Sequence, residues 1–374
     1  MKVVIASGIW PPDVGGPATH SPELAGYLAS RGHDVVALTT ASAPPPPEGY
    51  PVRWVPRSRP PGFRHAEYAL RLAMLSRRAD VVYVNSVLTR GAVGSRAPAV
   101  AKLTDDPAYE RSRRLGLFAG DLDAFQRYRG GLRVRALRLM RDVALRRTAR
   151  VLCPSRYLGE LAVAWGVDRD RVTVLENATP ELGMLPSREE ARARLGIDGP
   201  LLAFAGRLGP AKALDVALRA LARVNGVSLV LAGDGQERAS LEALTAELGL
   251  ADRVRFAGPV PRAEVLCLYR AADAALLSSA GENFPHSVVE ALAVGTPVIS
   301  TAVGGVAEVV EDGVNGLLVP AGDVERLAAA IERLTSDPEL RDGLAAAAAA
   351  SVERLRPEHV YGRLEQILVE AAAE

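Results

Sequence analysis

Residues 201–212 read LLAFAGRLGPAK, a run of five apolar residues that passes directly into a glycine-rich turn ending at Lys212. A short apolar run bounded by glycine is typical of a strand buried on both faces of a parallel sheet. Four more such runs follow, at 227–232, 253–257, 274–277 and 297–301, and helical patterns separate them. This alternation predicts a doubly wound α/β domain with helices on both faces of its sheet.

The amino-terminal half repeats this alternation. Strands are expected at 3–6, 34–38, 81–84, 99–103, 151–153 and 172–175, with a helix over 22–30. Residues from about 178 to 200 are polar and helical in pattern, so we place a domain boundary near residue 178. The carboxyl-terminal helices are expected at 324–334, 338–349 and 357–373. Two doubly wound domains bind their ligand in the cleft between them, at the carboxyl ends of the strands.

Composition and charge exclude several classes of protein. The chain has 374 residues, 48% of them apolar, and its net charge of +1 divides into +11 for residues 1–178 and −10 for residues 179–374. The two charged halves indicate either two domains with different partners or two unrelated surfaces. No run approaches the ~18 apolar residues of a membrane span, and the apolar stretch at 3–6 is too short for a signal peptide. Cys153 and Cys267 lack disulfide or zinc spacing, so we expect a cytoplasmic protein without a metal site.

A proline- and glycine-rich loop, residues 11–17, follows the first expected strand and opens a helix. Gly15 and Gly16 let the backbone approach a ligand closely, and the N–H groups of a helix N-terminus attract an anion. The alternative is an ordinary turn. The G-x-G-x-x-G spacing of dinucleotide sites is absent, which disfavours a dinucleotide-dependent oxidoreductase.

Two cations, Arg207 and Lys212, follow the strand expected at 201–206. Such a pair suits a diphosphate, with the arginine as a fork and the lysine as a point charge. The alternative is two solvated charges at a turn. Lys212 is one of only three lysines among 45 basic residues, which favours a function for it.

Two glutamates frame the stretch ENFPHSVVE, residues 282–290. Glu282 is expected in the loop after a strand, and Glu290 about one and a half turns into the next helix. A carboxylate accepts hydrogen bonds from paired sugar hydroxyls, and backbone N–H groups within 283–287 can hold phosphate oxygens. The alternative is one ordinary helix-terminal glutamate and one surface glutamate.

These motifs resemble the retaining glycosyltransferases of family 4, which have the GT-B fold. Gly206-Arg207-Leu208 with Lys212, and Glu282-x7-Glu290 running into residues 291–299, carry the resemblance. The loop 11–16, the segment 31–35, Pro154-Ser155, Asn177 and residues 313–319 match the family in order and spacing. The resemblance covers nearly the whole chain.

The resemblance implies two Rossmann-like domains, 1–178 on the acceptor side and 179–356 for the nucleotide sugar, facing each other across a deep cleft. A terminal helix, 357–374, packs back towards the first domain. The implied reaction is metal-independent transfer of a sugar, with retention, from a nucleoside-diphosphate sugar. UDP and GDP are the expected carriers, and no cofactor is expected. The acceptor is a hydroxyl of a saccharide, lipid-linked or small-molecule substrate, in envelope polysaccharide, glycolipid or glycosylated metabolite biosynthesis.

The family's site residues carry over to matching positions. Arg207 and Lys212 would neutralise the departing diphosphate, and Glu282 would contact the donor sugar. Glu290 would bind the ribose hydroxyls, and Gly15-Gly16 would close over the phosphates. The other residues expected to bind the donor are Asn283, Phe284 and Pro285.

One stretch departs from the family. Where many relatives carry a histidine facing the donor sugar, this chain has Asp105 and Asp106 within Ala101–Pro107. Either aspartate is a candidate to orient the sugar or to deprotonate the acceptor. The alternative is an aspartate that caps a loop before proline.

The segment Arg127–Arg150 holds nine arginines and a single acid, Asp142. Helical spacing puts five apolar residues on one face that is expected to pack: Leu132, Ala136, Leu139, Met140 and Val143. The family analogy offers peripheral contact with an anionic membrane at its inner face; a solvated cationic face is the alternative. Aromatic residues are few and no recognition motif is present, so we expect no nucleic acid partner.

Two other functions stay open. A nucleotide-sugar epimerase shares the architecture, and a non-catalytic sugar-nucleotide-binding protein would keep the Glu290 contact. The second would need no cations for a leaving group, so Lys212 argues against it. Product formation separates these functions from sugar transfer.

Overall fold

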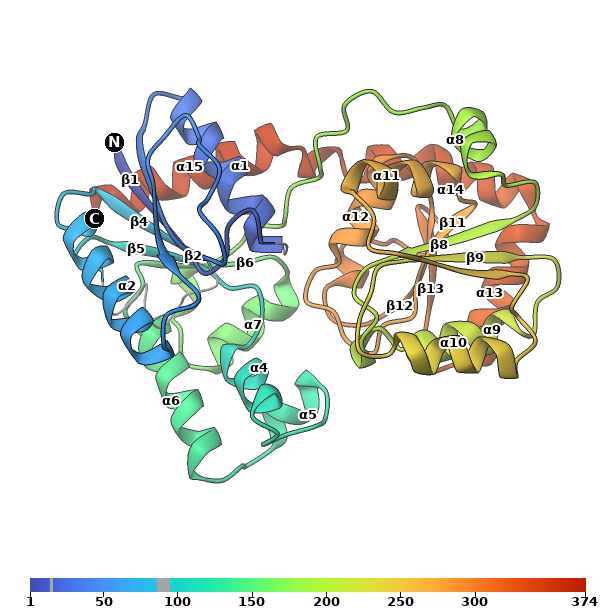
Figure 1. The fold of residues 1–374 in the computed structure, drawn as a ribbon, viewed down its shortest axis with the longest axis horizontal. Coiled ribbons are helices and arrows are strands. Elements are labelled where there is room, and N and C mark those ends of the chain that lie inside the picture. The colour runs from blue at the N-terminus through green and yellow to red at the C-terminus, as the bar shows by residue number, and fades with distance from the viewer. Residues whose placement is uncertain (14–15, 86–94) are drawn as a thin grey trace. The chain divides into compact units, whose positions relative to one another are not determined.

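A computed structural model describes residues 1–13, 16–85 and 95–374. Within it the chain forms two compact units. Unit 1 is Met1–Glu176 together with Glu358–Glu374, and unit 2 is Asn177–Pro357. Each unit has one parallel sheet between layers of helices (Figure 1), and the two doubly wound domains expected from the sequence are confirmed.

Unit 1 contains a seven-stranded sheet in the order β3-β2-β1-β4-β5-β6-β7, with every neighbouring pair parallel. Its strands are β1 Lys2–Ser7, β2 Asp34–Ala41, β3 Val52–Pro56, β4 Val81–Asn85, β5 Ala99–Lys102, β6 Arg150–Cys153 and β7 Val172–Val174. Its helices are α1 Gly16–Ser30, α2 Pro61–Ser76, α4 Pro107–Arg114, α5 Leu122–Arg127, α6 Leu132–Arg146, α7 Arg156–Ala164, the short η1 Arg169–Arg171 and α15 Pro357–Ala373. Strands β1 and β4 are almost wholly buried because helices cover both faces.

Unit 2 contains a six-stranded parallel sheet in the order β10-β9-β8-β11-β12-β13. Its strands are β8 Leu201–Ala205, β9 Ser228–Ala232, β10 Val254–Gly258, β11 Ala274–Leu277, β12 Val298–Thr301 and β13 Gly316–Val319. Its helices are α8 Arg188–Leu195, α9 Leu214–Leu221, α10 Arg238–Glu247, α11 Arg262–Ala271, α12 His286–Ala293, α13 Val324–Ser336 and α14 Pro338–Ser351, with the short η2 Pro210–Lys212, η3 Val306–Glu308 and η4 Glu353–Leu355. In Figure 1, α9 and α10 cover one face of this sheet, and α11, α12 and α14 cover the other.

Several expected boundaries differ from the observed ones. Helix α1 begins at Gly16 rather than at Pro22, which lies inside it without an N–H to donate. Buried Ala18 and Leu28 lie at its two ends, so packing against the sheet outweighs the missing bond. In the segment 178–200, which was expected to be helical, only α8 is a helix. A Ser187 capping box starts α8, and Gly196 in the left-handed conformation ends it.

The last helix, α15, packs on α1 within unit 1. The Tyr361 hydroxyl donates to Glu23 over 2.8 Å, and Glu365 contacts His33 at 2.7 Å. One side of α15 is buried along its length, through Val360, Tyr361, Leu364, Ile367, Leu368 and Ala371. Unit 1 is therefore closed by residues that come after the whole of unit 2 in the chain.

The packing face expected for α6 is wrong. Leu132, Leu139 and Met140 are 84%, 62% and 52% exposed. The buried positions are Val134, Arg141, Ala144 and Leu145. Arg141 is buried because its guanidinium lies over the Trp165 ring and pairs with Asp106. Among the described residues, no helix is long and apolar enough to cross a bilayer.

Candidate functional site

The loop after β8 carries Lys212 at the end of η2. Ser278 donates its hydroxyl to the Lys212 carbonyl over 2.9 Å, and the Ala280 N–H donates to the Ala211 carbonyl over 2.9 Å. The next residue, Ala213, has a φ of +44°, a left-handed conformation that disfavours a side chain. The loops after the neighbouring strands β8 and β11 are thus fastened to each other, with local backbone strain beside Lys212.

These fastened loops bring Lys212 and Glu282 together. The Lys212 ammonium pairs with Glu282 Oε1, and the Ser279 hydroxyl donates to the same oxygen over 2.7 Å. Both side chains are mostly buried, with 23% and 12% of their surfaces exposed. A cation held by a carboxylate that a serine fixes in turn is preorganised to face charge that develops on a ligand.

The Arg207 side chain is exposed and makes no hydrogen bond or ion pair with any residue in the described ranges, whereas the Arg207 carbonyl accepts from the Gly209 N–H over 3.0 Å. Its backbone is nevertheless fixed, because the next residue, Leu208, donates its N–H to the Asp234 carbonyl over 2.9 Å. A Cβ at Gly233 would lie 1.9 Å from the Gly206 carbonyl oxygen, and one at Gly235 would lie 2.2 Å from that of Leu208. The sequence reasoning missed this second glycine pair, although Gly-x-Gly directly after a strand is a recognisable signal.

Residues 283–285 lead into α12, and their side chains differ in burial. Phe284 is 6% exposed and belongs to the core of unit 2, and Pro285 is buried at the N-cap of the helix. The side chains of Phe284 and Pro285 are therefore committed to packing rather than to contact with a ligand. Asn283 is half-buried, and the Glu282 carbonyl accepts from the Gly305 N–H over 3.0 Å.

Glu290 lies on α12 with 17% of its side chain exposed. Arg262, the first residue of α11, places Nη2 3.2 Å from Glu290 Oε1. The pKa of Tyr269 is raised, mainly because the phenol is buried and also because of the Glu290 charge, so this phenol stays protonated. Neither Arg262 nor Tyr269 was expected from the motifs, because their proximity to Glu290 depends on how α11 and α12 pack.

The two aspartates of unit 1 occupy different environments. Asp106 is fully buried as the N-cap of α4, accepts from the Ala108 N–H over 2.9 Å and pairs with Arg141 at 2.7 Å. Asp106 therefore has the environment of the alternative given above, an aspartate that caps the chain before a proline. Asp105 is half-buried and accepts the Asp106 N–H over 2.7 Å. Gly16 opens α1 and is exposed, whereas Gly15 lies outside the described residues.

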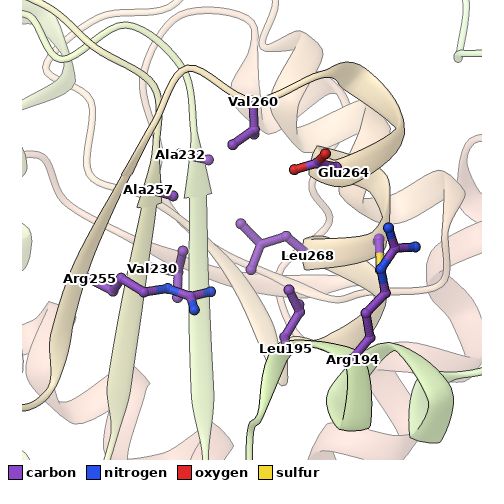
Figure 2. A pocket seen from close by; sticks show the side chains of 10 residues that line it. Arg194, Leu195, Val230, Ala232, Arg255, Ala257, Val260, Glu264 and Leu268 are labelled. Carbon is purple, nitrogen blue, oxygen red and sulfur yellow. The ribbon is translucent and has the colours of Figure 1, made fainter.

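A separate cavity of about 210 Å³ lies on the sheet of unit 2, between β9, β10, α8 and α11 (Figure 2). Its walls are mainly apolar, including Leu195, Val230 and Leu268, and Arg194, Arg255 and Glu264 stand at its edge. Among the described residues, no group of three or more His, Cys, Asp and Glu side chains is arranged to hold a metal ion.

Comparison with known proteins agrees with this architecture. Residues 15–178 match the glycosyl transferase 4-like domain, and residues 187–351 match the glycosyl transferases group 1 domain. The Anabaena protein HepE in complex with UDP superposes with a TM-score of 0.79 at 23% identity, over 99% of this chain and 100% of that one. Sucrose-phosphate synthase from Thermosynechococcus elongatus superposes with a TM-score of 0.81 at 21% identity, over 100% and 99% of the two chains. The fold of this chain is thus that of the GT-B glycosyltransferases.

Both halves of the chain thus match glycosyltransferase domain families, and together the two matches support a GT4-like glycosyltransferase. A D-inositol 3-phosphate glycosyltransferase of Frankia alni is 39% identical over 206 residues, 51% of this chain and 51% of the relative. The enzyme of that name from Mycobacterium marinum is 43% identical over 154 residues, 39% of this chain and 33% of the relative. The matched part thus spans about half or less of the length of these relatives.

Proposed function

We propose that this protein transfers a sugar, with retention and without a metal, from a nucleoside-diphosphate sugar to an acceptor hydroxyl. The observation that carries the proposal is the Lys212–Glu282 pair, held by Ser279 on two fastened loops. Glu290 lies on α12, which begins four residues after Glu282. The similar protein HepE, whose structures contain UDP and UDP-glucose, supports a uridine diphosphate carrier.

In the reaction, the bond between the anomeric carbon and the β-phosphate oxygen breaks, and its electron pair leaves with the diphosphate. Arg207 and Lys212 meet the negative charge that grows on that oxygen, so they stabilise the transition state more than the bound donor. The acceptor oxygen bonds to the anomeric carbon and releases its proton to a base. Asp105 is our candidate for that base, because Asp106 is buried and paired.

The acceptor class follows from the relatives rather than from the described site. Relatives named D-inositol 3-phosphate glycosyltransferases act, by that name, on a phosphorylated polyol. Among the saccharide, lipid-linked and small-molecule acceptors that the sequence allows, we therefore propose the small-molecule class. A phosphorylated polyol is the first acceptor to test.

The first experiment is a thermal-shift panel with UDP, GDP, ADP and TDP, each with and without EDTA. A ligand at 100 times its Kd stabilises the folded protein by about 2.7 kcal/mol. We expect UDP or GDP to raise the Tm, with no effect of EDTA. The control variant is Arg219→Ala, which removes an exposed cation of α9 that belongs to no proposed site. It should show the same rise in Tm with the nucleotide as the wild-type protein.

Product analysis with the nucleoside-diphosphate sugar of whichever nucleotide binds completes the test. Transfer to an acceptor with retained configuration supports the proposal. Conversion of the donor to its epimer would show an epimerase instead, and binding without turnover would show a sugar-nucleotide-binding protein. If no nucleotide shifts the Tm, the diphosphate site is wrong.

We also propose that α6 contacts an anionic membrane surface. Its outward face combines exposed Leu132, Leu139 and Met140 with the exposed arginines of the same helix, Arg133, Arg135 and Arg146. Apolar side chains enter the headgroup region while arginines meet lipid phosphates. The protein should sediment with phosphatidylglycerol vesicles and not with phosphatidylcholine vesicles. Leu139→Ser with Met140→Ser should abolish sedimentation, and Val369→Ser, on the exposed side of α15, should not.

A further inference from the structure

The cavity on the sheet of unit 2 is formed by residues that share a face on each element around it. Lining residues two positions apart on one strand point to the same face of the sheet. On β9 and β10 these residues are Val230, Ala232, Arg255 and Ala257. Across from them, Glu264, Cys267 and Leu268 share one face of α11 at helical spacing. The cavity is therefore a gap between the sheet and α11 (Figure 2).

This gap exists because small side chains stand on the sheet side of it. Ala232, at the end of β9, and Ala257, near the end of β10, each contribute only a methyl group. Strand β10 is an edge strand, and Ala257 stays exposed. An apolar cavity of about 150 Å³ takes up benzene, so this one, at about 210 Å³, has room for an aromatic ring with a short chain.

Two arginines at the edge of the cavity have no partner. Among residues 1–13, 16–85 and 95–374, none forms a hydrogen bond or ion pair with the side chain of Arg194 or Arg255. By contrast, Arg192 on the same helix as Arg194 pairs with Asp273 at 3.4 Å. Figure 2 shows Arg194 and Arg255 on opposite sides of the cavity, with Glu264 on the side of Arg194. Two positive charges and one negative charge leave the edge of the cavity positive.

We propose that this cavity binds a small aryl carboxylate, with its ring between the sheet and α11 and its carboxylate at Arg194 and Arg255. A guanidinium donates parallel hydrogen bonds to a carboxylate and also stacks on aromatic faces. Val230 and Leu268 offer the ring an apolar surface on either side. Sites for drug-sized ligands have about 300–1,000 Å³, so the cavity is too small to enclose a nucleotide or a long acyl chain. Its lining residues do not include Lys212, so the proposal does not rest on the proposed function.

Isothermal titration calorimetry with three compounds tests the site. 3-Phenylpropanoate has the ring and the charge, 3-phenylpropanamide keeps the shape without the charge, and propanoate keeps the charge without the ring. We expect one molecule of 3-phenylpropanoate to bind per chain, at least about ten times more tightly than the amide, because hydrogen bonds to charged groups are the stronger ones. Propanoate should show no saturable binding at the same concentrations, because it has no ring to fill the cavity.

Four variants assign the binding to this cavity. Arg194→Gln and Arg255→Gln each remove one charge and should weaken the acid at least about threefold while leaving the Kd of the amide unchanged. Ala257→Leu fills the cavity from an exposed position and should abolish binding of both compounds. Arg219→Gln removes an exposed charge of α9, on the other face of the sheet, and should change neither Kd. The Tm of every variant is measured first, so that only folded protein is compared.

Three results would overturn the proposal. The first is no saturable binding of 3-phenylpropanoate to the wild-type protein. The second is equal affinity for the acid and the amide, since the two arginines would then have no part in binding. The third is wild-type affinity for the acid in folded Ala257→Leu, which would place the bound acid elsewhere on the protein. No nucleotide is present in these titrations, so none of the three results bears on sugar transfer.

Discussion

Lys212 is the residue whose removal tests the chemistry most directly. Lys212→Ala deletes the fixed cation and leaves Glu282 with only the Ser279 hydroxyl of the two contacts described, so we expect kcat to fall about 100- to 1,000-fold, the usual effect of losing one transition-state donor. KM for the nucleotide sugar should change only a few-fold, since the charge matters most as the diphosphate leaves. Steady-state kinetics with the donor found in the binding panel provide the measurement. An unchanged kcat would remove Lys212 from the reaction.

Lys102 supplies a prediction about pH. It is 4% exposed at the end of β5 and donates to the Leu175 carbonyl over 2.6 Å, and burial lowers its pKa to about 8. Between pH 8 and the ordinary lysine pKa near 10.4, the unfolded chain binds a proton that the folded protein has lost. The free energy of unfolding should therefore gain up to roughly 3 kcal/mol from this residue as pH rises through that range.

Urea unfolding of the wild-type protein and of Lys102→Met, at pH 7.5 and pH 10, checks that sign. The difference in unfolding free energy, wild type minus variant, should increase at the higher pH. Other groups that titrate in this range are common to both proteins and cancel. A difference that stays constant would mean that the pKa of Lys102 is not lowered in the folded protein.

At the scale of elements, Asp106 ties together α4 and α6. It caps α4 and pairs with Arg141, which lies over the Trp165 ring at 3.9 Å from its centroid. Removing one partner of a buried ion pair leaves the other charge uncompensated. Asp106→Asn should therefore lower the free energy of unfolding by about 3–5 kcal/mol.

The neighbouring Asp105→Asn is the matched variant. It should lower turnover in the transfer assay while changing the free energy of unfolding by less than about 1 kcal/mol, a small effect for a site outside the core. Chemical denaturation and kinetics on both variants separate the two roles. Stable Asp106→Asn protein with lost activity would reverse the assignment and return Asp106 to the reaction.

The sequence pattern reveals central strands better than edges and helix faces. The runs that became β1, β8 and β11 are continuously apolar because both of their faces are covered. Strand β3 escaped detection because it is an edge strand, only half-buried, with exposed Arg53 in its middle. The face of α6 was wrong for a related reason: Arg141 is buried by a partner 35 residues away in the chain.

The candidate site also divides into residues that local motifs reveal and residues that only the packing of helices brings together. Arg207, Lys212, Glu282 and Glu290 stand in local motifs, and the structure places Lys212 beside Glu282 and Glu290 on α12; their roles stay predictions. Arg262 carries no such local signal, because only the packing of α11 on α12 brings it to Glu290. Phe284 and Pro285 belong to a local motif too, but a motif does not tell a buried side chain from one that meets a ligand.

For the whole molecule, α15 makes the stability of unit 1 depend on the last helix of the chain. Leu368 is fully buried in that helix, and deleting a buried leucine side chain costs about 2–5 kcal/mol. Leu368→Ala should therefore lower the unfolding transition of unit 1 and leave the Kd for the nucleotide, whose binding we propose for unit 2, unchanged. Val369→Ala, at an exposed neighbour, is the control. Equal losses in stability and nucleotide affinity would show that the units do not behave independently.

The return of the chain to unit 1 also sets the order in which the protein is completed as it is made. A ribosome adds residues in sequence, so all of unit 2, Asn177–Pro357, is synthesised before the segment that finishes unit 1. Until α15 emerges, Tyr27 and the rest of its contact surface on α1 have no covering helix. The nascent chain thus carries one finished domain and one that still lacks a covering helix, and an incomplete domain is prone to misassembly during translation.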